Sequence, residues 1–320
     1  MGNSVTVETT IQTTKPNHRG FFADFFYRLW KEKRLGLIGA IIFMIFLFTG
    51  IFADFIAPYG YNDIDPVKYL RPPSAENWLG TDNLGRDLLS RVIYGARISV
   101  IIGFAATSLS ILVSVVIGIV SGYFGGKVDM LMQRMVDAWM CFPGLIILIV
   151  AISITGPGIW QVIVVLGLQY GVAGSRVVRG SVVSIKESVY IVAARAIGVS
   201  NIRMMLTHIL PNIMVPIIVL FSIRIAAVIM AEATLSFLGL GIPAPAPSWG
   251  AMLSTGGRSY MTQAPLLGIA PGITLALVIY SINVFGDAMQ DLLDPRLRGG
   301  IGSYSSDTKK RKGRKRKDFF

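Results

Sequence analysis

The stretch SVYIVAARAIGVSNIRMMLTHILPN, residues 188–212, lies between two long apolar segments, and its only basic or histidine side chains are Arg195, Arg203 and His208. Apolar residues recur in it every three to four positions, which is the period of a helix packed on one side. Many of the intervening side chains are small. A short, mildly basic helix at this place indicates a surface element between membrane-spanning helices.

The composition supports a membrane setting. Of the 320 residues, 53% are hydrophobic and 15% are charged, and the mean hydropathy is +0.61. A soluble domain this apolar would expose large adhesive patches, so we expect an integral membrane protein. Cys141 is the only cysteine, and His18 and His208 are the only histidines. A disulfide framework and a thiolate or histidine metal site are therefore not expected.

Six segments are long and apolar enough to cross the membrane, because a helix needs about 20 apolar residues to cross about 30 Å of hydrocarbon. Residues 138–175 carry no charge over 38 positions and would form two spans, separated by the turn sequence TGPG at 155–158. The other four spans are 35–52, 98–126, 209–231 and 259–286. The expected fold class is therefore an all-α integral membrane protein with six transmembrane helices.

The distribution of lysine and arginine predicts the orientation. With the N-terminus in the cytoplasm, 23 of these residues fall on the inner side and 6 on the outer side, as the positive-inside rule requires. Both termini of this multi-pass plasma-membrane protein are therefore expected in the cytoplasm. The basic run KKRKGRKRK, 309–317, fits attraction to anionic membrane lipid better than binding to nucleic acid.

The segment GFFADFFYRLWKEKR, 20–34, places aromatic residues beside basic ones, which suits a short helix in the inner headgroup region. An early extension of the first transmembrane helix explains the same pattern. The expected organisation comprises a cytoplasmic N-terminal segment (1–34), a first transmembrane helix (35–57), an extracytoplasmic loop (58–97), a five-helix core (98–290) that includes a cytoplasmic helix at about 184–206, and a basic tail (291–320).

The longest cytoplasmic loop between spans, 176–206, contains the opening stretch. Ser184 with Glu187 three residues later is a capping-box pattern and predicts a helix start there. Gly198 predicts a left-handed C-cap, and Ser200 can cap a second short helix. One narrow face of the first helix would carry Tyr190, Ala193, Ala194 and Ile197, with Arg195 off its centre. A groove on another protein could approach such a face closely, although a helix resting on the bilayer is an alternative.

Packing features follow from proline, glycine and isolated acids. Pro211 fits the first turn of the fifth span or a kink near its start. Glycine at every fourth position of 118–126 is typical of close approach between membrane helices. Glu232 and Asp287 mark the outer end of the fifth span and the inner end of the sixth, and we expect both to be boundary residues.

The pattern AARAIG followed by LP resembles the EAA loop of ABC-importer permeases. The matching positions are Ala193, Ala194, Gly198, Leu210 and Pro211. The chain departs from the family pattern at Val192, where a glutamate would stand, and at His208, where an isoleucine would stand.

Three longer stretches strengthen this resemblance: NWLGTDNLGRDLLSRVIYGARISV (77–100), EATLSFLGLGIPAPAPSWGAML (232–253) and FGDAMQDLLDPRLRG (285–299) are similar to segments of dipeptide and oligopeptide permeases. Over about residues 25–300, the chain resembles the second of the two paired permeases in the dipeptide, oligopeptide and nickel ABC-importer family.

The resemblance implies the type I ABC-importer permease fold and a heterodimer with a homologous second permease. It also implies two ABC ATPase subunits, which bind ATP and Mg²⁺, and an extracytoplasmic solute-binding protein. The coupling helix would dock an ATPase through Tyr190, Ala193, Ala194, Arg195, Ile197 and Gly198. A P-loop requires G-x-x-x-x-G-K-[ST]. The closest segment, GGKV at 125–128, has Ser121 where the first glycine of the pattern would stand and Val128 where the serine or threonine would stand. We therefore expect no catalytic residue and no cofactor on this chain.

Few residues are candidates for the translocation pathway. Arg224 is the only charge within an expected span, where burial costs at least ~2.5 kcal/mol. It would either face the pathway, where it could attract a peptide carboxylate, or pair with the second permease. Gln169, Tyr170 and Asn283 are further candidates, although such residues often bridge helices.

An ion-coupled or proton-coupled secondary transporter is the competing class, but it would be expected to carry acids inside the membrane and repeated halves. An intramembrane enzyme or receptor has no candidate catalytic residues in the spans. The sequence does not distinguish dipeptides, oligopeptides, nickel chelates and related solutes as substrates.

Overall fold

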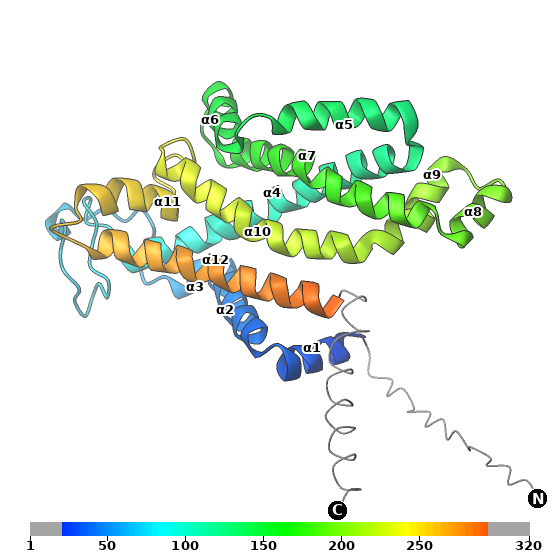
Figure 1. Ribbon diagram of the computed structural model, residues 1–320. Coiled ribbons are helices and arrows are strands. Elements are labelled where there is room, and N and C mark those ends of the chain that lie inside the picture. The colour runs from blue at the N-terminus through cyan, green and yellow to red at the C-terminus, as the bar shows by residue number, and fades with distance from the viewer. Residues whose placement is uncertain (1–20, 294–320) are drawn as a thin grey trace, which may run out of the picture.

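The computed structural model describes residues 21–293, and for residues 21–26 it describes the backbone alone. The basic run at 309–317 and most of the N-terminal segment lie outside the described residues. Within the described part the chain is helical, and an isolated antiparallel bridge between Thr81 and Asp87 is its only β-type pairing. Most of the long helices run side by side along one axis of the molecule (Figure 1).

Five helical segments are long and apolar enough to cross a membrane. They are α2 (Arg34–Ile51), α4 (Leu88–Phe124), α7 (Ile159–Lys186), the segment Asn201–Phe237 that contains α10 (Met214–Phe237), and α12 (Leu266–Leu293). The predicted all-α membrane fold is confirmed, and these segments correspond to five of the six predicted spans. The extent of α4 differs from the prediction, since it begins at Leu88, where the Asp87 side chain caps it by accepting from the Ser90 backbone N–H.

The remaining predicted span, in the first half of 138–175, is not a single helix. α5 (Gly126–Met140) and α6 (Gly144–Thr155) are bent by 85° and give a sixth span only if the pair counts as one broken span. The 12 residues of α6 extend about 18 Å at 1.5 Å per residue, which is less than the hydrocarbon thickness. Residues 127–137, which precede this predicted span, lie in the amphipathic helix α5. Pro143 accounts for the break, since the residue before a proline avoids the α-helical conformation.

The aromatic N-terminal segment forms a helix of its own, α1 (Phe21–Glu32). Lys33 has φ −133° and ψ 64°, which is not helical, and α2 begins one residue later. The alternative of an early extension of the first transmembrane helix is therefore wrong. Lys33 Nζ donates to Asp291 Oδ2 at 2.6 Å, which fastens this junction to the end of α12.

Small residues bring α4 and α7 together over most of their length. A Cβ at Gly118 would lie 2.6 Å from the Val178 side chain, and one at Gly122 would lie 2.9 Å from Val182. The predicted close approach is confirmed for these two glycines. Gly126 takes no part, because it begins α5 with φ +52° and has no neighbour within 4 Å of a Cβ.

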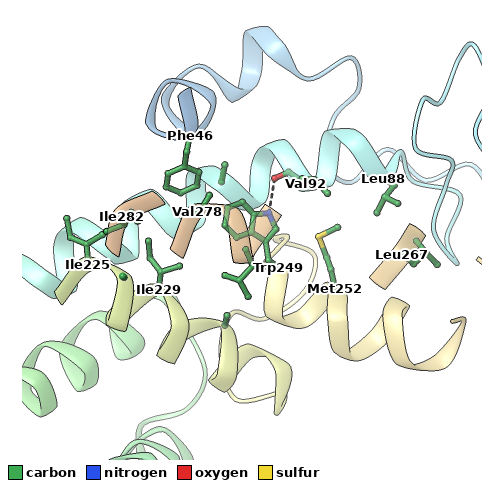
Figure 2. Packing of buried hydrophobic residues seen from close by; sticks show 14 residues of the cluster. Phe46, Leu88, Val92, Ile225, Ile229, Trp249, Met252, Leu267, Val278 and Ile282 are labelled. Carbon is green, nitrogen blue, oxygen red and sulfur yellow. Dashed lines mark hydrogen bonds between the residues drawn. The ribbon is translucent and has the colours of Figure 1, made fainter. Parts of the chain in front are cut away.

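The segment between α10 and α12 returns into the bundle. It contains α11 (Trp249–Met252) and the π-helical turn η4 (Leu253–Gly257). Trp249 is fully buried, its ring centroid lies 5.5 Å from that of Phe46, and its Nε1 donates to the Val92 carbonyl at 3.0 Å. Figure 2 shows this indole among side chains of α2, α4, α10 and α12. The expected last outer loop is thus largely part of the core.

The two ends of the bundle differ in content (Figure 1). Residues 57–87, with the short helices α3 (Ala53–Ile56) and η1 (Pro66–Lys68), lie at one end together with α11. The helices α8 (Val189–Ala196) and α9 (Asn201–Arg203) lie at the other. We call these the loop end and the α8 end.

Candidate functional site

The short helix α8 lies inside the opening stretch, but it starts later than the capping-box pattern predicts. Ser188 is its N-cap, and Ser184 lies within α7, which continues to Lys186. The predicted start at Ser184 is wrong because the apolar face of α7 continues past it: Val182 is buried and Ile185 packs on the same cluster. Packing on a neighbouring helix outweighs the local capping preference.

The C-terminus of α8 has the predicted geometry. Gly198 has φ +83°, the left-handed conformation that a glycine adopts without steric cost. The Val199 N–H donates to the Ala194 carbonyl at 3.2 Å, and the Gly198 N–H donates to the Arg195 carbonyl at 3.0 Å. These two bonds form a Schellman motif, which ends the helix after less than three turns. Ser200 is the N-cap residue of α9, although its side chain caps no backbone N–H.

After η2 (Met204–Ile209), a π-helical turn, Pro211 lies in the 3-10 turn η3 (Leu210–Ile213), immediately before α10. A proline here removes one backbone donor, and the regular α-helical bonding begins only after it. The predicted irregularity near the start of the fifth span is confirmed.

The predicted docking residues of α8 do not all face outward. Ile197 is 82% exposed and Tyr190 is 46% exposed, and Ala193, Arg195 and Gly198 are also exposed. Ala194 is 8% exposed and belongs to the buried face. It shares that face with the fully buried Ile191, three residues earlier, and both pack against α4, α7 and η2. We call the exposed side of α8 its open face. It holds the predicted docking residues Tyr190, Ala193, Arg195, Ile197 and Gly198, together with Val189 and Val192, which are 86% and 58% exposed.

Two predicted pathway residues meet in the structure. The guanidinium carbon of Arg224, in α10, lies 5.3 Å from the ring centroid of Tyr170, in α7. The Tyr170 hydroxyl donates to the Ala227 carbonyl at 3.3 Å, which holds the ring in place. Among the described side chains, those of residues 27–293, no carboxylate pairs with Arg224. A cation–π contact compensates only part of the cost of an apolar setting, so Arg224 retains capacity to bind an anion.

A groove of about 850 Å³ leads from this region toward the α8 end. Its walls come from α7, from the start of α10 with the turn before it, and from Gln290 of α12. The lining residues are Val177, Gly180, Ser181, Ser184, Ile185, Asn212, Ile213, Val215, Pro216, Val219, Leu220, Ile223 and Gln290. Leu220 and Ile223 lie within one helical turn of Arg224, so the Arg224–Tyr170 pair adjoins the groove.

The other two pathway candidates have different surroundings. Gln169 Oε1 accepts a hydrogen bond from Trp139 Nε1 at 2.8 Å, so it bridges α5 and α7. Asn283 is exposed on α12. Gln169 thus has the structural role that is common for polar residues in helical bundles.

Glu232 is a buried residue rather than a boundary residue. It is 1% exposed in α10, and its Oε1 accepts hydrogen bonds from Ser236 Oγ at 2.7 Å and from Ser248 Oγ at 2.8 Å. Ser248 directly precedes α11, so the carboxyl group fastens the returning segment to α10. The i, i+4 spacing of Glu232 and Ser236 was the one local signal of this contact.

Ion pairs that the sequence did not predict join the helices at both ends. At the α8 end, Asp129 accepts from Arg179 Nε at 2.6 Å and Asp137 pairs with Arg176, which ties α5 to α7. At the loop end, hydrogen bonds from Arg97 and Tyr94 lower the pKa of Asp54 below its ordinary value.

The loop between η1 and α4 has an exposed pair of its own. The hydrogen bond from Lys68 Nζ to Glu76 Oε2, 3.0 Å, lowers the pKa of Glu76 and raises that of Lys68. Groups this exposed contribute little to stability, so the pair orders the loop locally.

The fold and these features together define a class. A helical membrane bundle with a lateral groove, an arginine near it that pairs with no carboxylate among the described side chains, and a short open helix at one end has the properties of a subunit of a transport assembly. Such a subunit needs further chains to close its groove and to cover its open helix.

Comparison with known proteins gives the family. Residues 114–299 match the family described as binding-protein-dependent transport system inner membrane component. Residues 20–73 match the N-terminal transmembrane domain of oligopeptide transport permease C. The chain therefore belongs to the inner membrane components of binding-protein-dependent transport systems, as permease subunits of ABC importers.

Individual relatives support the same family assignment. The dipeptide transport system permease DppC of Alkalihalophilus pseudofirmus is 36% identical over 272 residues, 85% of this chain and 89% of the relative. The oligopeptide transport system permease OppC of Bacillus subtilis is 35% identical over 277 residues, 84% of this chain and 90% of the relative. The glutathione transport system permease GsiD of Escherichia coli O157:H7 is 36% identical and covers 86% of this chain and 90% of the relative.

A solved structure of the MetNI methionine ABC transporter, in inward-facing conformations, shares the fold. One of its chains aligns with a TM-score of 0.53 at 16% identity and covers 64% of this chain and 96% of its own length. The family resemblance inferred from the EAA-like pattern and the type I permease fold are thus confirmed. As a permease subunit, the chain is a non-catalytic multi-pass membrane component, and ATP hydrolysis resides in separate subunits.

Proposed function

We propose that this chain forms half of the pathway through which an ATP-driven importer moves short peptides across a prokaryotic plasma membrane. The names of the relatives above refer to dipeptides, oligopeptides and the tripeptide glutathione. These names support a peptide, rather than a nickel chelate, as the transported solute. The other half of the pathway would come from a homologous second permease, and an extracytoplasmic solute-binding protein would deliver the peptide.

In this proposal the open face of α8 docks one of two ABC ATPase subunits in the cytoplasm. The observation that carries this part is the exposure of Ile197 and Tyr190 on a helix whose opposite face is anchored in the bundle. A helix held on one side transmits displacement as a rigid body. The α8 end would then be cytoplasmic, residues 57–87 extracytoplasmic, and the basic run at 309–317 near anionic lipid.

Arg224 and Tyr170 would contribute to peptide recognition in the pathway. A guanidinium group binds a carboxylate with charge-assisted hydrogen bonds, and every unmodified peptide ends in one carboxylate. The groove beside the pair offers hydroxyl and amide groups from Ser181, Ser184, Asn212 and Gln290 along an otherwise apolar wall. Such a surface suits passage of varied side chains with one fixed charged group.

The docking role is tested with Ile197→Glu in the assembled complex purified in mild detergent. Because Ile197 is 82% exposed, the substitution leaves the bundle intact and adds a charge to the open face. We expect the ATPase subunits to be lost while the second permease is retained. Val67→Glu, at a residue 76% exposed at the loop end, is the matched control and should retain both. Retention of the ATPases by the Ile197 variant would refute the docking role.

The role of Arg224 is tested with Arg224→Gln and a pair of probes, a peptide with a free C-terminus and the same peptide amidated. If Arg224 binds the carboxylate, the substitution reduces transport of the free peptide, and the amidated peptide is transported poorly by the unaltered complex. If Arg224 instead pairs with an acid of the second permease, the substitution weakens assembly and affects both peptides equally. That second result would refute the recognition role.

A further inference from the structure

The helix α4 connects the two ends of the molecule without interruption. Its 37 residues, Leu88–Phe124, extend about 55 Å at 1.5 Å per residue. It contains no proline, and it packs closely on α7 at Gly118 and Gly122. A continuous helix held this closely along its length resists bending, because neither a proline nor a π-bulge interrupts it. A displacement applied to one end of α4 therefore reaches the other end.

At the loop end, α4 is fastened to several segments that come from elsewhere in the chain. Trp249 of α11 donates to the Val92 carbonyl at 3.0 Å. The Tyr59 N–H donates to Ser90 Oγ at 3.1 Å, and Arg91 donates to the Tyr61 carbonyl at 2.9 Å. These bonds join the loop 57–87 and the returning segment to the first turns of α4, and we call these two segments the outer cap.

At the α8 end, one side chain of α4 contacts both short helices. Tyr123 is 6% exposed, and its hydroxyl donates to Asn201 Oδ1, at the start of α9, at 2.7 Å. The guanidinium carbon of Arg195, in α8, lies 5.5 Å from the centroid of the Tyr123 ring. The ring also belongs to the buried cluster that contains Ile191 and Ala194.

A lysine also holds the C-terminal end of α4 in place. Lys186 Nζ, at the end of α7, donates to the carbonyls of Gly122 and Tyr123 at 3.2 and 3.3 Å. These carbonyls belong to the last turn of α4, which lacks partners within its own helix, and a cation there is favoured by the helix dipole. The end of α4 is therefore fixed relative to α8 rather than free to fray.

We propose that Tyr123 is the positioning residue that joins the docking helix α8 to α4, so that movement of α8 displaces α4 and with it the outer cap. The inference rests on the proposed docking role of α8. It assigns the mechanical link to one buried tyrosine. The covalent connection from α7 to α8 at 187–188 reaches α4 only through the contact between α4 and α7, whereas Tyr123 joins α4 to α8 and α9 directly.

The test measures movement at the outer cap in the assembled complex. Spin labels are attached at Val67→Cys, in the outer cap, and at Ile154→Cys, near the end of α6, where the side chains are 76% and 80% exposed. The natural Cys141 is exposed and is replaced by serine. The distance between the labels is measured without nucleotide and with ATP and vanadate.

We expect the distance between the labels to change with nucleotide in the chain with Tyr123 and to stay unchanged in Tyr123→Leu. In Tyr123→Phe we expect a smaller change, because this variant keeps the ring over Arg195 and loses only the bond to Asn201. Tyr61→Phe is the matched control, because its hydroxyl makes no hydrogen bond within residues 21–293 while its ring contacts Tyr94. It should shift like the unaltered chain. Co-purification of the ATPases with each variant shows that assembly is intact.

An unaltered chain without a shift, or a full shift in both Tyr123 variants, would overturn the inference. If Tyr123→Leu does not assemble, the phenylalanine variant decides, and a full shift there would count against the hydroxyl link. Absence of ATPases from the unaltered complex would count against the proposed function itself, so the two failures are distinguishable.

Discussion

Replacing Glu232 by alanine tests the account of the loop end. The carboxyl group is buried, and its Oε1 accepts from two serine hydroxyls that are also buried, with Ser236 at 3% and Ser248 at 0% exposure. The substitution removes the shared acceptor and leaves a space beside α11. Both hydroxyls then lack the acceptor that they have in the native structure.

The expected loss follows from the number of unpaired groups. A buried donor left without a partner costs about 1–3 kcal/mol, so two such donors cost about 2–6 kcal/mol before the cavity is counted. Measured hydrogen bonds in membrane proteins are weaker, on average about 0.6 kcal/mol, which favours the lower end of that range. Glu232→Gln keeps a carbonyl oxygen as acceptor and should cost less than about 1 kcal/mol.

The assay is thermal unfolding in detergent of the unaltered chain, Glu232→Ala, Glu232→Gln, Ser248→Ala and the double variant Glu232→Ala/Ser248→Ala. We expect the alanine variant to be clearly less stable than the glutamine variant. We also expect the double variant to be more stable than the sum of the single effects predicts, because removing Ser248 Oγ also removes one unpaired donor. Equal stability of the alanine and glutamine variants, or strict additivity, would refute the assignment of Glu232 as a structural acceptor.

Three further expectations follow. Gly118→Leu should destabilise the α4–α7 contact by about 1–3 kcal/mol through overpacking, since even a Cβ there would lie 2.6 Å from Val178. Thermal unfolding checks this, and an unchanged midpoint would show that the helices can separate at no cost. Gly198→Ala should cost about 1 kcal/mol because φ is +83°, again measured by thermal unfolding, whereas a gain in stability would mean that α8 ends differently. The folded-state pKa values of Asp54 and Glu76 are lowered. Their ion pairs therefore stabilise the folded loop end above the unfolded pKa values of about 4, and this stabilisation is lost as the pH falls through the folded values. A spin label at Val67→Cys should keep its mobility from pH 8 to 5 and gain mobility only below about pH 4, and a transition near pH 6 would contradict this assignment.

The membrane fold was predictable from the sequence because hydrophobic length is a local property. Uncharged segments of sufficient length identify the spans, and the C-cap at Gly198 is visible because few residues other than glycine adopt that conformation. The close packing at Gly118 and Gly122 was predictable for a similar reason. Each of these features is encoded in one continuous stretch of the chain, about 20 residues for a span and fewer for the C-cap and the glycine repeat.

Most of the errors have a different cause. The break between α5 and α6 is local, since Pro143 accounts for it, but a count of uncharged residues does not register it. The helical state of Ser184, the inward position of Ala194 and the burial of Glu232 depend on contacts with other segments of the chain. Ala194 is buried by residues of α4, α7 and η2, and Glu232 is satisfied by a serine 16 residues later. Helical periodicity grouped Ala194 with Ala193 on one face, but it could not show which side of the helix the bundle covers.

This distinction matters for experiments on the docking helix. A charge at Ala194 would disrupt the buried cluster beneath α8, and a large residue at Gly198 would strain the C-cap, so either variant would lose activity without testing docking. Ile197 is suitable because its side chain is exposed and its backbone is ordinary.

The most direct test of the central claim, that α8 faces the cytoplasm and contacts an ATPase, is site-directed labelling of Ile197→Cys in a Cys141→Ser background. The account predicts that a membrane-impermeant thiol reagent added to intact cells leaves this cysteine unmodified, and that a short cross-linker joins it to an ATPase subunit in the assembled complex. Labelling from outside the cell, or an assembled complex that gives no such cross-link, would contradict it.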